Sequence, residues 1–159
     1  SVAKALLLHE RTMLSASGRG SRLTMSRRSL LEVARDTMVA PTGRLTNASL
    51  RAEIAQTEMD KMCYDATLRK TNEAAKAGRG MGPEGSMFKL YLSELGQRVA
   101  DLRQRMNGAD SLIWDGEDYN QEDKEITREW LYGKASTILG GTSEVQLNII
   151  TKRVLGLPE

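Results

Sequence analysis

Two adjacent glycines followed by three polar residues form the segment of this sequence that is best suited to bind a ligand or support a reaction. The order is Gly140-Gly141-Thr142-Ser143-Glu144, and Gln146 follows two positions later. Ser143 and Gln146 have the spacing of a capping box, which predicts that a helix begins there. Glycines let the backbone pass close to a bulky group, and free amides at a helix start can hold a carbonyl oxygen or an anion. The segment is therefore either a ligand-binding turn or a tight connection between two helices.

Few other residues have the type and spacing of a reactive site. His9 is the only histidine, and we expect it to be packed or exposed rather than to transfer protons. Cys63 is the only cysteine, so an internal disulfide is excluded and a reducing compartment is indicated. No set of residues has the spacing of metal ligands. A local basic cluster suits a solvated loop, a subunit contact or phosphate groups; its members are Arg19, Arg22, Arg27 and Arg28.

The composition describes one globular domain with a core of aliphatic side chains. The 159 residues are 40% hydrophobic and 28% charged, with a net charge of +2 that directs no strong field at nucleic acid. Aromatic residues make up only 4%, which favours packed helices over a β-sandwich. No apolar run approaches the length of a membrane span. The chain starts without methionine, so a targeting segment upstream would not be seen.

The apolar residues recur at three- and four-residue spacing, which predicts helices throughout. The expected helices cover about 2–18, 26–37, 47–77, 86–106, 122–139 and 143–155, with Ser26, Asn47 or Ser49, and Ser86 as N-caps. The most regular stripe is Leu92, Leu95, Val99, Leu102 and Met106. Other expected buried residues are Ala52, Ala55, Met59, Met62 and Ala66, widened by Ile54 and Cys63, and then Ile126, Trp130, Leu131, Val145, Ile149, Ile150 and Val154. The predicted fold is all-α, an antiparallel four-helix-type bundle with additional short helices.

The two ends of the chain resemble one known family. The tail from Ile138 to Pro158, built around Gly140-Gly141-Thr142-Ser143-Glu144, resembles the closing motif of acyl-CoA dehydrogenases. The opening from Val2 to Gly18, through His9-Glu10-Arg11, resembles the first helix of the same family's C-terminal domain. The resemblance implies that residues 1–159 are that C-terminal helical domain, without the N-terminal helical and middle β-domains of the parent.

This resemblance implies a function and a catalytic base. The parent would be an FAD-dependent acyl-CoA dehydrogenase that forms an α,β double bond in an acyl-CoA thioester. In many members a glutamate immediately before the Gly-Thr of the closing motif removes the α-proton, but Gly140 occupies that position here. Isovaleryl-type and long-chain members place the base on the first helix beside an arginine, and Glu10 before Arg11 matches that position. Glu10 as a surface residue paired with Arg11 is the alternative.

The same resemblance implies the binding residues. Thr142, Ser143 and Glu144 correspond to a flavin-contacting segment, and Gly140, Gly141 and Thr142 would lie near the thioester. Leu8, His9 and Arg11 correspond to the lining of the acyl-CoA pocket. Gln104 and Gly108 are what remains of a Gln-x-x-Gly-Gly flavin loop, although Gln104 fits an exposed polar position equally well. No metal is implied.

One departure from the family leaves the role of this subunit open. Relatives carry an Arg-x-x-Phe-Gly motif that reaches the flavin pyrophosphate of a neighbouring subunit, and residues 31–38 lack it. Arg35 or another basic residue substitutes, or this subunit shares its flavin with an unlike partner, as in heteromeric bacterial enzymes for bulky substrates.

The implied partners are an acyl-CoA, an electron-transfer flavoprotein or similar acceptor, and other subunits of a homo- or hetero-oligomer, in the bacterial cytoplasm. The main alternative function is a non-catalytic assembly subunit. A nitroalkane oxidase-like enzyme is the weakest option, because neither base position holds an aspartate.

Overall fold

The computed structural model describes residues 2, 6, 28–39, 43, 45–79 and 82–158. Regular structure within these residues is helical, apart from one isolated β-bridge between Val39 and Leu45. The helices are α2 (Leu30–Met38), α3 (Ala48–Ala74), α4 (Gly85–Asn107), α5 (Gln121–Gly133) and α6 (Ser143–Ile149). Wider π-helical turns extend α3 over Ala75–Arg79 and α6 over Ile150–Val154, and 3-10 segments cover Gly108–Leu112 and Lys134–Thr137. The all-α prediction is confirmed.

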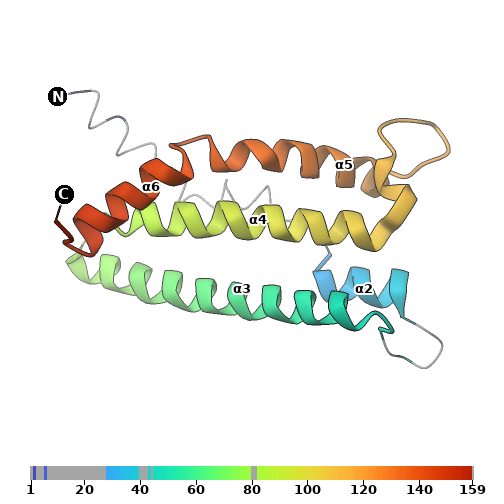
Figure 1. Ribbon diagram of the computed structural model, residues 1–159, viewed down its shortest axis with the longest axis horizontal. Helices are drawn as coiled ribbons and strands as arrows, with labels where there is room; N and C mark the ends of the chain where they lie inside the picture. The colour runs from blue at the N-terminus through green and yellow to red at the C-terminus, as the bar shows by residue number, and fades with distance from the viewer. Residues whose placement is uncertain are drawn as a thin grey trace.

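Helix α4 lies at the centre of the bundle (Figure 1). Helix α3 runs antiparallel along one side of α4, and α5 runs antiparallel along the other. Helix α2 packs against the second half of α4, whereas α6 lies beside its beginning. The central helix therefore contacts each of the other four, and any site on this domain is positioned from α4.

An apolar cluster occupies the end of the bundle where α2, α3 and α4 meet. Leu102 is 1% exposed, and its neighbours are nearly as well covered. The predicted α4 stripe is confirmed from Leu95 onward, while Leu92 is only half-buried. Cluster members are Leu30, Val33, Ala34, Leu50, Ile54, Val99, Leu102 and Met106.

Side-chain caps set most helix starts, although not always at the predicted residue. Ser29, rather than Ser26, caps α2 in a full capping box with Glu32. Asn47 caps α3 by accepting from the Leu50 amide, as predicted. The prediction for Ser86 is wrong, because α4 starts at Gly85 without a side-chain cap and Ser86 is buried inside it. Asn120 supplies the cap of α5.

The predicted buried stripe of α3 is wrong except at Ile54, which is buried. The buried residues of this helix are Leu50, Ile54, Thr57 and Tyr64. The predicted stripe lies on another face, where Met59 is 53% and Met62 70% exposed. Cys63 is exposed as well. Alanine and methionine recur at helical spacing on the exposed face, whereas the buried face includes Thr57 and Tyr64. Apolar periodicity therefore pointed to the face that does not meet α4.

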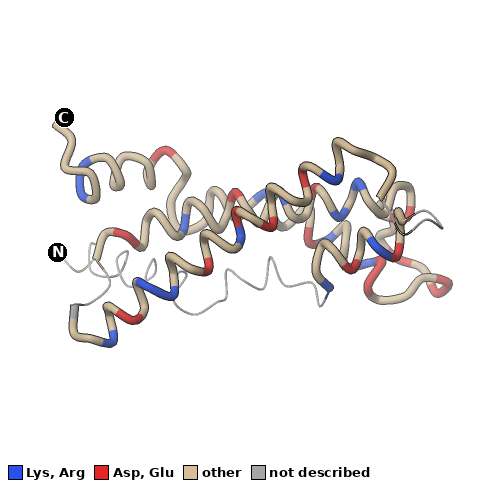
Figure 2. Tube along the Cα trace, turned by 90° about the horizontal axis from the view of Figure 1, so that it is seen from below, with Lys and Arg blue, Asp and Glu red and all other residues tan. Residues whose placement is uncertain are grey.

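Helix α5 is shorter than predicted, since the chain tightens into a 3-10 turn after Gly133. Its most buried residues are Thr127 and Gly133, whereas Leu131, expected in the core, is 48% exposed. Basic and acidic residues alternate along the described helices without forming a patch of one sign (Figure 2). Along this part of the chain, every helix is too short or too polar to cross a lipid bilayer.

Candidate functional site

The segment between α5 and α6 forms a turn that only glycine accommodates easily. Gly140 has φ 69° and Gly141 has φ 103°, both in the left-handed region that disfavours side chains. A Cβ added to Gly141 would lie 2.7 Å from the Gln146 side-chain nitrogen. Both the dihedral and the close approach of Gln146 therefore require glycine at position 141.

Thr142, not Ser143, is the N-cap of α6, so the predicted capping box of Ser143 and Gln146 is wrong. The Thr142 hydroxyl accepts from the Val145 amide at 3.4 Å, and the Thr142 carbonyl accepts from the Gln146 amide at 3.0 Å. The second partner of the predicted box, Gln146, has a different role.

Gln146 turns inward and holds the glycines. Its side chain is fully buried, and its Nε2 donates to the carbonyl of Gly140 at 2.9 Å and that of Gly141 at 3.4 Å. Its Oε1 is buried and has no partner among the described residues. A glutamine in this position is thus a support for the turn, a role that its spacing in the sequence did not indicate.

Lys89 of α4 holds the same turn from the other side. Its Nζ donates to the Gly141 carbonyl at 2.6 Å, and the residue is only 7% exposed. Burial lowers the pKa of Lys89, and the Glu94 carboxylate opposes that shift. Lysine is rarely buried unless it is paired. The sequence did not indicate this role, because the carbonyl that Lys89 holds lies 52 positions further along the chain.

Lys89 is the first of four residues spaced one helical turn apart, which we name the polar stripe of α4: Lys89, Ser93, Gln97 and Asp101. Each bonds to the chain between α5 and α6. Gln97 donates to the Gly133 carbonyl and the Thr137 hydroxyl, both at 3.1 Å. The Ser93 carbonyl accepts from Ser136 at 3.4 Å, and Asp101 accepts from Trp130 and from Lys134. The turn is therefore one end of a segment fastened to α4 along its length.

These bonds fix the direction of two peptide units. The described residues contain no cis peptide bond, and in a trans peptide the N–H points opposite to the C=O. The carbonyls of Gly140 and Gly141 are held by Gln146 and Lys89. The amides of Gly141 and Thr142, which complete the same peptide units, consequently point away from those two side chains. Neither amide has an acceptor within the described part of the chain.

The remaining polar residues of the turn differ in accessibility. Ser143 is half-buried and Glu144 is exposed. Hydrogen bonds from its own backbone amide and from the Thr142 hydroxyl hold the pKa of the Glu144 carboxyl below its ordinary value. Glu144 therefore stays ionised, which suits a polar contact better than a proton acceptor tuned toward neutrality.

Two other predicted site residues, Gln104 and Gly108, are not brought to this turn. Gln104 is half-buried and Gly108 exposed at the far end of α4. They lie about 22 Å and about 28 Å along the helix axis from Lys89, at 1.5 Å per residue. Leu8, His9, Glu10 and Arg11 lie outside the described residues. Across the described residues, no three His, Cys, Asp or Glu side chains gather closely enough to hold a metal ion.

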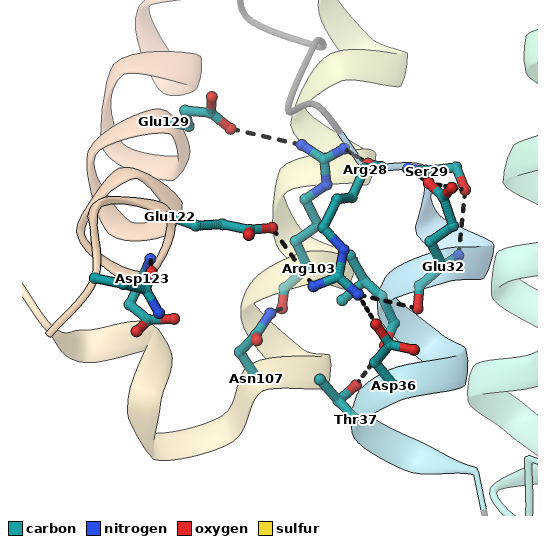
Figure 3. A network of polar contacts seen from close by, with 12 residues as sticks. Arg28, Ser29, Glu32, Asp36, Thr37, Arg103, Asn107, Glu122, Asp123 and Glu129 are labelled. Atoms are coloured by element: carbon teal, nitrogen blue, oxygen red, sulfur yellow. Dashed lines mark hydrogen bonds and ion pairs between the residues drawn. The ribbon is translucent and has the colours of Figure 1, made fainter.

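A second polar network joins α2, α4 and α5 (Figure 3). Arg103 is 5% exposed, donates to the Arg28 carbonyl at 2.6 Å and lies 3.5 Å from the Glu129 carboxylate. Arg28, from the predicted basic cluster, pairs with Asp36 and lies 3.6 Å from Glu122. Burial raises the pKa of Glu129, and Arg103 partly opposes it. Arg28 is thus a structural residue, and Arg35 is exposed on α2.

Comparison with known proteins assigns this arrangement to a family. The model of the acyl-CoA dehydrogenase C-terminal domain matches residues 1–155. The chain belongs to the acyl-CoA dehydrogenase family. The curated acyl-CoA dehydrogenase IpdE1 of Mycolicibacterium smegmatis is 27% identical over 157 residues, which are 99% of this chain and 36% of that protein. The chain thus spans about a third of the length of its curated relative.

Two solved structures share the fold. A steroid acyl-CoA dehydrogenase, the Tcur3481-Tcur3483 G363A variant, superimposes with a TM-score of 0.70 at 24% identity, covering 96% of this chain and 38% of that one. The ChsE4-ChsE5 complex from Mycobacterium tuberculosis gives a TM-score of 0.63 at 21% identity, covering 83% and 34%. The predicted family and domain type are confirmed. Acyl-CoA dehydrogenases are FAD-dependent oxidoreductases. The turn before α6 therefore belongs to a domain from a family of flavin enzymes.

Proposed function

We propose that the full-length protein carrying this domain is an FAD-dependent acyl-CoA dehydrogenase that introduces an α,β double bond into an acyl-CoA thioester. The observation that carries the proposal is the turn at Gly140–Thr142 in a domain of this family. Its two carbonyls are held toward Lys89 and Gln146, and its amides face the other way. Outward amides are the donors that a thioester oxygen or a flavin hydroxyl requires.

Some groups of the turn would bind the substrate, and others would bind the cofactor. The amides of Gly140 to Thr142 would donate to the thioester carbonyl as negative charge develops on its oxygen. Thr142, Ser143 and Glu144 would contact the flavin, for which their hydroxyls, amides and ionised carboxylate supply suitable polar partners. FAD, when bound, supplies a hydride acceptor. The donor set of the turn fits both ligands without any side chain at positions 140 and 141.

Glu10 is the proposed catalytic base, because Gly140 stands where many family members have their glutamate. A base must reach the substrate α-carbon, and its origin along the chain does not matter. Exclusion of water beside the acyl chain would raise the pKa of its carboxyl toward neutrality. Leu8, His9 and Arg11 would line the same thioester pocket.

The flavin is proposed to be shared between subunits. Gln104 and Gly108 lie about 22 Å and about 28 Å along the axis of α4 from Lys89, so they would contact the flavin of another subunit rather than that of their own turn. The exposed Met59 and Met62 of α3 offer an apolar surface for such an assembly. One solved structure that shares the fold is a complex of two different proteins, and an unlike partner is our preferred reading for this subunit.

A bulky acyl-CoA is the preferred substrate class, and an electron-transfer flavoprotein or similar acceptor is the proposed oxidant, in the cytoplasm. The experiment is to purify the full-length protein with any partner encoded beside it and to assay acyl-CoA oxidation with an artificial acceptor. Glu10→Gln should abolish turnover while the bound flavin keeps its absorbance. Glu117→Gln, an exposed glutamate of the α4–α5 connection, is the matched control. Wild-type rates in the Glu10 variant would show that the base has been misassigned.

A non-catalytic assembly subunit is the second candidate. Gly140 at the usual base position and the missing Arg-x-x-Phe-Gly motif favour it. A full-length protein that stays colourless with added FAD and partner, yet still binds that partner, would support this function over the first.

A further inference from the structure

Two donors from different parts of the chain converge on the backbone of one short turn. Lys89 reaches the Gly141 carbonyl at 2.6 Å across 52 positions of sequence, and Gln146 reaches the Gly140 carbonyl at 2.9 Å. Both side chains are more than nine-tenths buried. Holding a charged amine in that environment is costly unless its partner is well placed. A flexible connection between two helices would not need two buried side chains to hold its carbonyls.

Helix packing alone does not explain the buried lysine. A leucine or methionine at position 89 would fill a similar volume beside Phe88 without the cost of desolvating a charge. What an apolar residue would not do is fix the direction of the Gly141–Thr142 peptide unit. Two glycines with positive φ give this turn more backbone freedom than most residues have, so the direction must be set by something outside it.

We propose that Lys89 is a positioning residue for the acyl-CoA dehydrogenase reaction: by holding the Gly141 carbonyl toward α4, together with Gln146 on Gly140, it aims the Gly141 and Thr142 amides at the thioester and the flavin. This inference rests on the proposed function. Lys89 touches neither ligand and acts through the turn. The polar stripe of α4 also helps to position the turn, because Gln97 bonds to the end of α5, from which the chain leads into the turn.

The test compares variants of the full-length protein assembled with FAD and its partner. Lys89→Met keeps an unbranched chain of similar length and removes the donor. Gln146→Met removes the second donor to the same carbonyls and serves as an independent variant should the first fail to fold. Lys61→Met is the matched control, because Lys61 is an exposed lysine that pairs with Asp65 within α3. The turn's geometry is measured by amide hydrogen exchange over residues 138–146, with residues 30–38 of α2 as the internal reference.

We expect Lys89→Met to bind FAD in full amount and to exchange faster over 138–146 only. Its kcat should fall about 100-fold, the loss that a displacement of about 1 Å causes at a reacting centre, while KM changes little. Gln146→Met should show the same pattern, and Lys61→Met should resemble the wild type in exchange and kcat.

The outcomes separate the two proposals. Unchanged kcat in Lys89→Met, with a lowered melting temperature, would overturn the positioning role and leave Lys89 as a packing residue. Unchanged exchange over 138–146 would overturn it too. A wild-type protein that binds no FAD would instead overturn the proposed function, and the exchange data would still report whether Lys89 orders the turn.

Discussion

The two ends of α4 hold their neighbours by different means. Toward its C-terminus, Val99, Leu102 and Met106 pack into an apolar cluster with α2 and α3. Toward its N-terminus, Lys89 and Gln97 bond to backbone carbonyls between α5 and α6. Apolar packing fixes how close two helices lie but does not discriminate among peptide orientations. Hydrogen bonds to carbonyls do. The apolar end also has such a bond, from Arg103 to the Arg28 carbonyl, whereas at the other end Lys89 and Gln97 hold the segment that includes the proposed site.

The largest expected effect comes from the apolar end. Leu102→Ala should lower the free energy of unfolding by about 2–5 kcal/mol, because Leu102 is 1% exposed and its removal leaves a cavity. Chemical denaturation of the full-length protein measures the change. Hydrogen exchange over residues 138–146 should stay close to wild type while the fold persists. A selective increase there would mean that the two ends of α4 are not independent.

Gly141→Ala should have the next largest effect and should act at the other end. The alanine meets a left-handed φ of 103° and a Cβ position 2.7 Å from the Gln146 nitrogen. A loss of about 2–3 kcal/mol is expected, since the dihedral alone costs about 1–2 kcal/mol. Gly78→Ala is the matched control, because Gly78 has φ 87° and open space around it. Equal losses in the two variants would show that the contact with Gln146 adds nothing.

The capping box of α2 tests a polar contact that belongs to the apolar end. Ser29→Ala should cost about 1 kcal/mol. It should also raise the pKa of Glu32, because hydrogen bonds from the Ser29 amide and hydroxyl hold that pKa below its ordinary value of 4.5. In the wild type, the contribution of Glu32 to stability is present above its unfolded pKa and is lost as pH falls through the folded one. An NMR titration of the Glu32 carboxyl follows the shift; an unchanged pKa in the variant would contradict the assignment.

The smallest expected effect is a pH dependence of the free energy of unfolding that comes from Glu129, a residue of α5 that lies near Arg103 of α4. Burial raises the pKa of Glu129 above 4.5, so the folded state favours its protonated form. That contribution is full below the unfolded pKa and is lost as pH rises through the folded one. Relative to wild type, Glu129→Gln should therefore gain stability, by less than about 1 kcal/mol, between pH 4.5 and the raised pKa. Denaturation midpoints across that range would decide it, and a constant difference would contradict the prediction.

The same contrast explains what the sequence could predict. The apolar stripe of α4 from Leu95 to Met106 and the Asn47 cap were predictable because each depends on local spacing. The roles of Lys89 and Gln146 were not, since both depend on which carbonyl a distant segment presents once the helices have packed. The buried face of α3 was mistaken because alanines and methionines recur at helical spacing on its exposed face, while its buried face includes Thr57 and Tyr64. The glycine turn was recognisable as a motif, but its cap shifted from Ser143 to Thr142 when Gln146 turned inward.

The one-turn spacing of Lys89, Ser93, Gln97 and Asp101 also limits how this domain can change in length. Inserting or deleting one residue between Gln97 and Asp101 would rotate the two halves of α4 by about 100° relative to each other. If the residues of one half of α4 kept their bonds to the α5–α6 segment, the residues of the other half would lose theirs. A change in the number of residues in this stretch would therefore separate the turn from the helix that orders it.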